Sequence, residues 1–492
     1  MATTAQELQT TLPAGPRRLP YLGHMLSLRQ DPLGFLQQLQ RTYGNMATIY
    51  LGKNPAVLLF RPEHVHYVLV EHPRNFSNRR LLRRNSNGGF ASEGLLTIDG
   101  EKHRQQRRAV QPAFHKKRVE GYAAIMEQYT QELLETWHPG DTVDMSRAMQ
   151  ALTLRIVSKC LFSIDLSSQL GPLSDAFDGV IGSSTSVAED LLNIRIDNPI
   201  TSYGRRMAAM RQLDILIYTL IAQRRDDDRD YQDVLSMLMS AQSGEEPGRK
   251  LTEKQIHDHI LTFLAAGHET TAIALVWTFY LLSRYPQVRI KLQDEMRSVL
   301  ADREPTLDDL AKLPYLDWVL NESMRLYPPA WLQMRFVAKE SELDGMRLPV
   351  GTLLIMSQWV IHRLPDIWQD AEMFKPERWD PVNGQQIPPG AYFPFGGGPR
   401  TCIGMPLAQL EARLILASIL QRYTPQPVPG YTPEFQPVIT LRPKRHLRVT
   451  LIPASSSDSD LQWTQPAGLQ EGLERQGCRT ALLSLFGLKT QL

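Results

Sequence analysis

A single cysteine inside a glycine-rich turn constrains this chain more than any other feature of its sequence. Cys402 closes the run FGGGPRTC, which begins at Phe395, and a helical pattern starts at Pro406. Proline suits the first turn of a helix, so Cys402 would lie just ahead of a helix N-terminus, where the dipole and the unpaired amides favour a thiolate. The glycines let a large flat ligand approach the sulfur. Such a thiolate suits the axial ligand of a haem iron, and a structural cysteine in a loop is the alternative.

A long apolar segment, roughly residues 256–282, carries the sequence AGHETT at positions 266–271. Its apolar residues recur at helical spacing, which predicts a buried central helix. Glu269 and Thr270 are costly in the middle of such a helix unless both side chains have partners. Either the pair has a chemical role, or Thr270 bonds back to a carbonyl in a helix groove loosened by small residues.

Two further motifs place an acid or a histidine near arginine. Glu322 and Arg325 are three residues apart on a predicted helix, so they share one face, and Arg378 follows in the run FKPERW. A surface pair of this kind contributes only about 0.3 to 0.5 kcal/mol, so the motif alone is weak. His103 and Arg107 share one face of a basic segment because they are four residues apart. The alternative for that segment is an exposed basic helix.

These motifs, in this order and at these separations, resemble the cytochrome P-450 superfamily over nearly the whole chain, to about residue 453. The resemblance is to its soluble bacterial and cyanobacterial members. It implies a mainly α fold with a minor β region, built as one large domain around a buried haem b, iron protoporphyrin IX, with Cys402 as the axial thiolate and metal ligand. We expect this domain to cover residues 1–454, with a proline-rich segment at 1–24 leading into the fold. Residues 455–492 begin with a linker-like composition and are expected to form a flexible tail.

The resemblance also implies roles for individual residues. Glu269 and Thr270 would relay protons to dioxygen, and Glu322, Arg325 and Arg378 would form a buried network beside the cysteine loop. The residues expected to bind the haem are Cys402, His103, Arg107, Arg335, Arg400, Phe395, Gly398, Ala266 and Gly404; His103 and the three arginines would bind its propionates. The residues expected to line the substrate pocket are Phe90, Leu95, Ala265, Ala330, Trp331, Leu332 and Ile439.

The activity that the resemblance implies is haem-dependent monooxygenation. One oxygen atom of dioxygen would enter a small apolar substrate, a fatty acid or a terpenoid, by hydroxylation or epoxidation. The alternatives are a haem-thiolate peroxygenase or isomerase, and a non-catalytic haem or lipid-binding protein. Neither alternative has a use for the relay formed by Glu269 and Thr270.

Electrons are expected from a separate ferredoxin or flavodoxin with its reductase, because no GxGxxG fingerprint follows a predicted strand. A basic face could dock such an acidic partner, and ordinary solvated charges are the alternative. The residues of this basic face are Lys102, Arg104, Arg108, Lys116, Lys117 and Arg118.

Composition and charge limit the functional class and the cellular compartment of the protein. The net charge is only +2 over 492 residues, and no basic tract alternates with aromatic residues, which excludes a nucleic-acid role. Three widely separated cysteines predict neither a disulfide framework nor a CxxC metal site, which favours a reducing compartment. The N-terminus has no signal-peptide pattern, and no run of about 20 apolar residues predicts a membrane span. We therefore expect a cytoplasmic protein.

Overall fold

The computed structural model describes residues 12–78, 91–165, 170–181, 196–227, 229, 231–243 and 251–454. Three sequence predictions concern residues outside these ranges. They are the tail at 455–492, the first part of the proline-rich segment at 1–11, and the pocket candidate Phe90.

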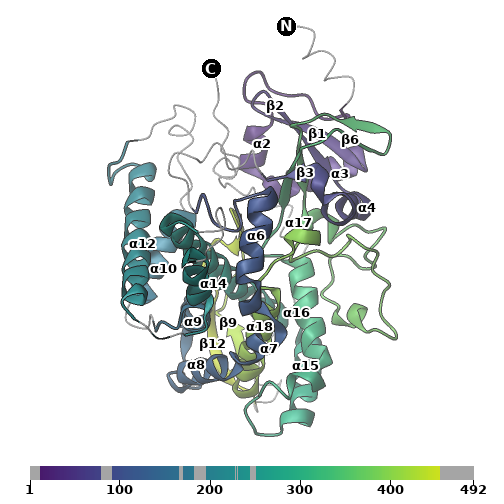
Figure 1. Ribbon diagram of the computed structural model, residues 1–492. Coiled ribbons are helices and arrows are strands. Elements are labelled where there is room, and N and C mark those ends of the chain that lie inside the picture. Colours follow the sequence, from purple (N-terminus) through teal and green to yellow (C-terminus); the bar gives the residue numbers. More distant parts are fainter. Residues whose placement is uncertain are drawn as a thin grey trace.

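The described part of the chain is mostly helical with small sheets, as the sequence predicts (Figure 1). The longer helices are α3 (Pro32–Tyr43), α6 (Gly100–Val110), α8 (Ala123–Glu135), α9 (Met145–Phe162), α10 (Leu170–Ile181), α12 (Ser202–Arg225), α13 (Val234–Ser243), α14 (Glu253–Arg284), α15 (Pro286–Leu300), α16 (Pro314–Leu326) and α18 (Met405–Arg422). The shorter helices are α2 (Met25–Gln30), α4 (Pro62–His66), α7 (Lys116–Glu120) and α17 (Gln358–Ile361).

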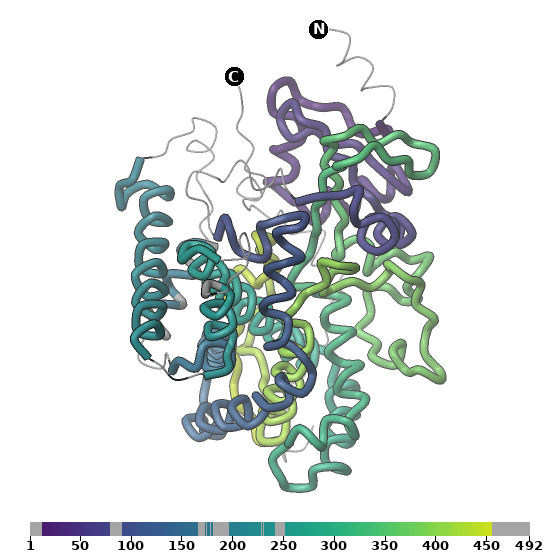
Figure 2. Tube along the Cα trace, viewed as in Figure 1, coloured from purple at the N-terminus to yellow at the C-terminus, as the bar shows by residue number. Residues whose placement is uncertain are grey.

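The largest sheet joins the N-terminal part of the chain to a segment about 300 residues later in the sequence. Its strand order is β1 (Met46–Leu51), β2 (Asn54–Leu59), β8 (Leu353–Met356), β5 (Gln333–Val337) and β3 (Phe76–Ser77). β2 and β8 are parallel, with Ala56 opposite Leu353, and the other neighbours are antiparallel. Figure 2 shows the purple N-terminal trace beside the green trace of this later segment.

Three smaller β units complete the fold. A three-stranded sheet has the order β4 (Thr142–Asp144), β12 (Arg448–Pro453) and β9 (Tyr423–Pro427). The strands β6 (Ser341–Leu343) and β7 (Met346–Leu348) form one hairpin. The strands β10 (Phe435–Pro437) and β11 (Leu441–Pro443) form another, whose turn approaches α14.

Helix α14 is the buried central helix that the sequence predicts. A capping box starts it, because Thr252 Oγ1 accepts from the Gln255 amide at 3.2 Å and Gln255 Oε1 accepts from the Thr252 amide at 3.0 Å. The helix is long and apolar enough to cross a membrane. However, 83% of its most apolar 18-residue stretch is buried inside the fold. That burial is the environment of a core helix, and α14 packs against both α9 and α18, the helix that follows Cys402.

Candidate active site

The cysteine loop presents its sulfur to hydrogen-bond donors at the start of α18. The Cys402 amide donates to Phe395 O at 2.9 Å and so closes the loop. Burial raises the pKa of the Cys402 thiol above its usual value, and hydrogen bonds from the backbone amides of Gly404 and Met405 and the charge of Arg107 offset only part of this rise. Cys402 is nevertheless exposed. Backbone donors therefore face a cysteine that is open to a ligand, and a metal cation bound there would favour its thiolate form.

Two glycines of this loop serve different purposes. Gly398 has a φ of +64°, and a Cβ there would lie 1.8 Å from Leu69 O, so the backbone of the loop packs directly on that segment. At Gly404, the nearest neighbour of an added Cβ would be Cys402 Sγ at 3.9 Å. The first glycine is thus required by packing, and the second leaves the surroundings of the sulfur open.

The AGHETT stretch forms an accessible window in an otherwise buried helix. Ala266 is exposed and Thr270 is partly exposed, while Glu269 and Thr271 are buried. Gly267 has a packing role, because a Cβ there would come 2.7 Å from Val157 Cγ2 in α9. Ala266 therefore leaves this part of α14 accessible, and Gly267 lets α9 approach the helix closely.

Glu269 and Thr270 point to different partners. Thr270 Oγ1 donates to Ala266 O at 2.7 Å, which is the back-bonding that the loosened-groove alternative expects. The Glu269 carboxylate reaches the β10–β11 hairpin, where Oε1 accepts from Thr440 Oγ1 at 2.7 Å and lies 3.8 Å from Arg442 Nη1. The sequence analysis missed Thr440 and Arg442, since no local pattern connects them to Glu269.

Four predicted basic residues gather near the cysteine loop. Burial, followed by the charges of Arg400 and Arg107, lowers the pKa of His103 to about 4, so its imidazole is neutral at pH 7. Burial, followed by the charge of Arg400, lowers the pKa of Arg335 to about 10. Asp99, which the sequence analysis also missed, lies 2.6 Å from Arg400 Nη2. The Asp99 carboxylate thus pairs with Arg400 and acts through its charge on Arg335, while Arg107 adds another cation near Arg400. The remaining positive charge suits a ligand with two carboxylates.

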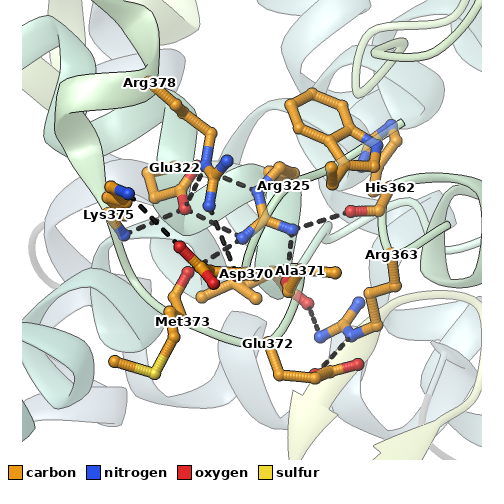
Figure 3. A network of polar contacts seen from close by, with 12 residues as sticks. Glu322, Arg325, His362, Arg363, Asp370, Ala371, Glu372, Met373, Lys375 and Arg378 are labelled. Carbon is orange, nitrogen blue, oxygen red and sulfur yellow. Dashed lines mark hydrogen bonds and ion pairs between the residues drawn. The ribbon is translucent and has the colours of Figure 1, made fainter. Parts of the chain in front are cut away.

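The predicted network of Glu322, Arg325 and Arg378 is buried in the core (Figure 3). Glu322 Oε1 accepts from Arg325 Nη2 at 2.8 Å, from Arg378 Nε at 2.9 Å and from the Lys375 amide at 3.0 Å. Its Oε2 accepts from Arg325 Nε at 2.9 Å and from Trp379 Nε1 at 3.0 Å. Burial alone would raise the pKa of Glu322, but the two arginines outweigh it and hold that pKa below its usual value. The three residues predicted from the sequence are therefore in direct contact.

Arg325 also connects this network to the chain that follows α17. Its guanidinium donates to the carbonyl oxygens of His362 at 2.8 Å, Ala371 at 2.7 Å and Met373 at 3.0 Å. The side chains of Arg325 and Glu322 are both fully buried. The network consequently fixes the course of the segment that leads to the cysteine loop.

The predicted pocket residues lie at different depths. Trp331 is fully buried, and its Nε1 donates to Val438 O at 3.0 Å, so its indole is part of the core. Leu95 and Ala265 are buried, and Ala330 and Leu332 are partly exposed. Ile439 is 51% exposed and presents the most accessible apolar side chain of this set.

Comparison with known proteins gives this site its context. The sequence model of the cytochrome P-450 family matches residues 13–449, which is most of the chain. The chain belongs to the cytochrome P-450 family. Its fold agrees with this assignment, and the cysteine loop, the window on α14 and the Glu322 network all lie within the matched range.

Several known proteins are similar to this chain over most of their length. Cyclooctat-9-en-7-ol 5-monooxygenase of Streptomyces melanosporofaciens is 36% identical over 86% of this chain and 91% of its own. Pentalenene oxygenase of Streptomyces avermitilis is 32% identical over 84% of this chain and 92% of its own. Among solved structures, the retinoic acid-bound cyanobacterial CYP120A1 matches with a TM-score of 0.77 and 28% identity, over 90% of this chain and 99% of that chain.

Membership of the cytochrome P-450 family makes this protein a monooxygenase that uses a thiolate-ligated haem, dioxygen and electrons from redox partners. The residues of the site fit that cofactor. An exposed cysteine with amide donors suits iron, and the excess of guanidinium groups suits the propionates. The accessible window at Ala266 and Thr270 provides a small-residue surface for the opposite side.

Proposed function

We propose that this cytochrome P-450 hydroxylates or epoxidises a terpenoid, with a long-chain fatty acid as the second candidate. The observation that carries the proposal is that two relatives covering most of the chain are named for terpenoid oxidation, on cyclooctat-9-en-7-ol and on pentalenene. Retinoic acid, the ligand named for the solved relative, is an isoprenoid acid with both terpenoid and fatty-acid character. The accessible apolar side chain of Ile439 suits either class.

We also propose which residues hold the haem. Cys402 would ligate the iron through its sulfur, with Phe395, Gly398 and Gly404 shaping the loop around it. Ala266 would lie on the other side of the ring. The residues proposed for the propionates are His103, Arg107, Arg335 and Arg400. When bound, the haem supplies the activation of dioxygen, and the thiolate favours cleavage of the O–O bond.

The remaining chemistry would come from the chain itself. Thr270, at the accessible window, would hold a hydrogen bond to the reacting oxygen, and Glu269 would pass protons toward it. We propose an apolar pocket that excludes water and is supported from the core by Trp331. The residues proposed to line this pocket are Leu95, Ala265, Ala330, Leu332 and Phe90, the last of which lies outside the described residues.

A ferredoxin or a flavodoxin with its reductase is the proposed electron donor. On the basic face, Lys102 lies 3.1 Å from Glu93 and Lys116 lies 3.8 Å from Glu120, so part of its charge is compensated. Arg108 and Lys117 of the same predicted set are exposed. An acidic partner could compete for such weak surface pairs, which supports docking there. We propose a cytoplasmic protein with one haem domain over residues 1–454.

A ligand panel tests the substrate class. The haem-loaded ferric protein is titrated with pentalenene, a cyclooctane-ring diterpene alcohol, all-trans-retinoic acid, lauric acid and palmitic acid, and the spin-state change of the iron is followed by absorbance. Compounds that respond are then incubated with a plant-type ferredoxin, its reductase and NADPH. We expect the terpenoids to give the larger spectral change and a product that carries one added oxygen atom.

Other outcomes reassign the function. A response restricted to the two fatty acids would transfer the proposal to fatty-acid hydroxylation. Product formation with hydrogen peroxide but none with the reductase system would support the peroxygenase alternative. Spectral binding without any product in either system would support a carrier.

A further inference from the structure

The β10–β11 hairpin is tied to α14 beside the proposed proton relay. Its turn, residues 438–440, ends in Thr440, whose Oγ1 donates to Glu269 Oε1 at 2.7 Å. Both residues are buried, Thr440 at 4% and Glu269 at 5% exposure. A hydrogen bond to a buried carboxylate is charge-assisted, so it fixes the position of that oxygen more firmly than a bond between neutral groups would.

The turn itself is held at three points. Trp331 Nε1 donates to Val438 O at 3.0 Å, and Trp277 Nε1, about two turns beyond Glu269 on α14, donates to Leu441 O at 2.8 Å. The Leu441 amide donates to Pro329 O at 2.9 Å. The backbone around Thr440 is therefore anchored both to α14 and to the segment before β5, which gives its hydroxyl a defined place.

Arg442 brings a positive charge to the same carboxylate. Its Nη1 lies 3.8 Å from Glu269 Oε1, and its side chain is only 15% exposed. Gln436 is its cross-strand partner in the hairpin, and Gln436 Oε1 accepts from Arg442 Nε at 3.3 Å. The pairing of β10 with β11 thus orients the guanidinium toward Glu269, where it favours the ionised form of the acid.

We propose that Thr440 and Arg442 are positioning residues for Glu269, so that the C-terminal hairpin fixes the acid of the proton relay. This inference rests on the relay role proposed for Glu269 and deepens it. Glu269 is adjacent to Thr270 in sequence, but successive residues on a helix point about 100° apart, and α14 alone leaves the torsions of the Glu269 side chain free to place its carboxylate in several ways. The hairpin supplies that missing constraint.

The same turn exposes Ile439, one residue before Thr440, at the proposed substrate pocket. Substrate contact and proton delivery therefore involve neighbouring residues of one anchored turn.

Variants of the hairpin test the inference in the haem-loaded full chain. Thr440→Val removes the hydroxyl at nearly constant shape, Thr440→Ser restores it, and Arg442→Gln removes the charge. Arg445→Gln is the matched control, because that arginine is on the same segment with a side chain that is 76% exposed. Each variant is assayed with all-trans-retinoic acid, a plant-type ferredoxin, its reductase and NADPH. The readouts are NADPH oxidation, hydrogen peroxide released per NADPH, and their dependence on pH.

We expect Thr440→Val to slow NADPH oxidation about tenfold, the rate equivalent of one hydrogen bond, and to raise the peroxide fraction. Thr440→Ser and Arg445→Gln should behave like the native protein. Arg442→Gln should shift the acidic limb of the pH–rate profile toward higher pH, because a carboxylate without its cation protonates more readily. The carbon-monoxide spectrum should stay unchanged in all variants, which separates positioning from loss of fold.

Glu269→Gln separates this inference from the proposed relay. Thr440→Val should add no further effect in the Glu269→Gln background, because the two residues act through one contact. A defective Glu269→Gln beside native-like Thr440→Val and Arg442→Gln would overturn the positioning inference and leave the relay standing. A native-like Glu269→Gln would remove the relay role and the inference with it.

Discussion

Replacing Cys402 by serine is expected to abolish both the long-wavelength band of the reduced, carbon-monoxide-bound protein and monooxygenase turnover. The amides of Gly404 and Met405 at the N-terminus of α18 offset part of the rise in the pKa of Cys402 that burial causes, and a bound iron would favour the thiolate further. A serine hydroxyl in the same place does not ionise at neutral pH and does not donate electron density as sulfur does. The measurement is a carbon-monoxide difference spectrum of the purified variant, together with its haem content and its rate of product formation.

Cys160 offers a matched control for this experiment. It lies in α9 with 2% exposure, and burial raises the pKa of its thiol well above the usual value. A buried, protonated thiol is unreactive, so Cys160→Ala should retain the long-wavelength band even where it lowers stability. A normal band in Cys402→Ser would refute the assignment of the ligand. Loss of the band in folded, haem-containing Cys160→Ala would contradict the assignment of Cys402 and indicate Cys160 as the iron ligand.

Local spacing predicted the parts of the site that depend on one helix or one turn. The proline at 406 and the apolar pattern after it correctly placed a helix, α18, directly after Cys402. The i, i+3 spacing of Glu322 and Arg325 put both side chains on one face of α16, and the structure shows them hydrogen-bonded. Arg378 followed from the resemblance to the family, since 56 residues separate it from Glu322.

Contacts between distant segments could not be predicted in this way. Thr440 meets Glu269 across 171 positions, and Asp99 meets Arg400 across 301. Both contacts depend on how a hairpin or a loop packs against a helix, and neither leaves a pattern in the local sequence. Trp331 is a further example, because the sequence predicts it in the substrate pocket. In the structure it is a core residue, and its indole donates a hydrogen bond to Val438 O, a distant backbone partner.

The second large effect is expected at Glu322. Glu322→Gln keeps the shape of the side chain but removes the negative charge that faces Arg325 and Arg378, which are themselves buried. Removing one member of a buried ionic network costs about 3 to 5 kcal/mol, because charges are left without compensation. That is a large fraction of the roughly 5 to 15 kcal/mol by which a folded protein is stable. We expect a correspondingly lower free energy of unfolding in urea and faster loss of haem.

The exposed pair Arg297 and Asp294 provides the matched control for Glu322→Gln. It has the same i, i+3 spacing and a similar N–O distance of 2.7 Å, but its side chains are 65% and 60% exposed. Asp294→Asn should therefore change the free energy of unfolding by less than about 1 kcal/mol.

The pH dependence of stability isolates the charge of Glu322 from its shape. The folded-state pKa of Glu322 lies below its usual value, so its stabilising contribution is present above the unfolded pKa of about 4.3 and is lost as pH falls through the folded pKa. The native protein should therefore lose stability on acidification through this range. The difference in free energy of unfolding between the native protein and Glu322→Gln should narrow accordingly. A gap that stays constant from neutral pH into this acidic range would attribute the effect to packing of the amide and not to the buried charge.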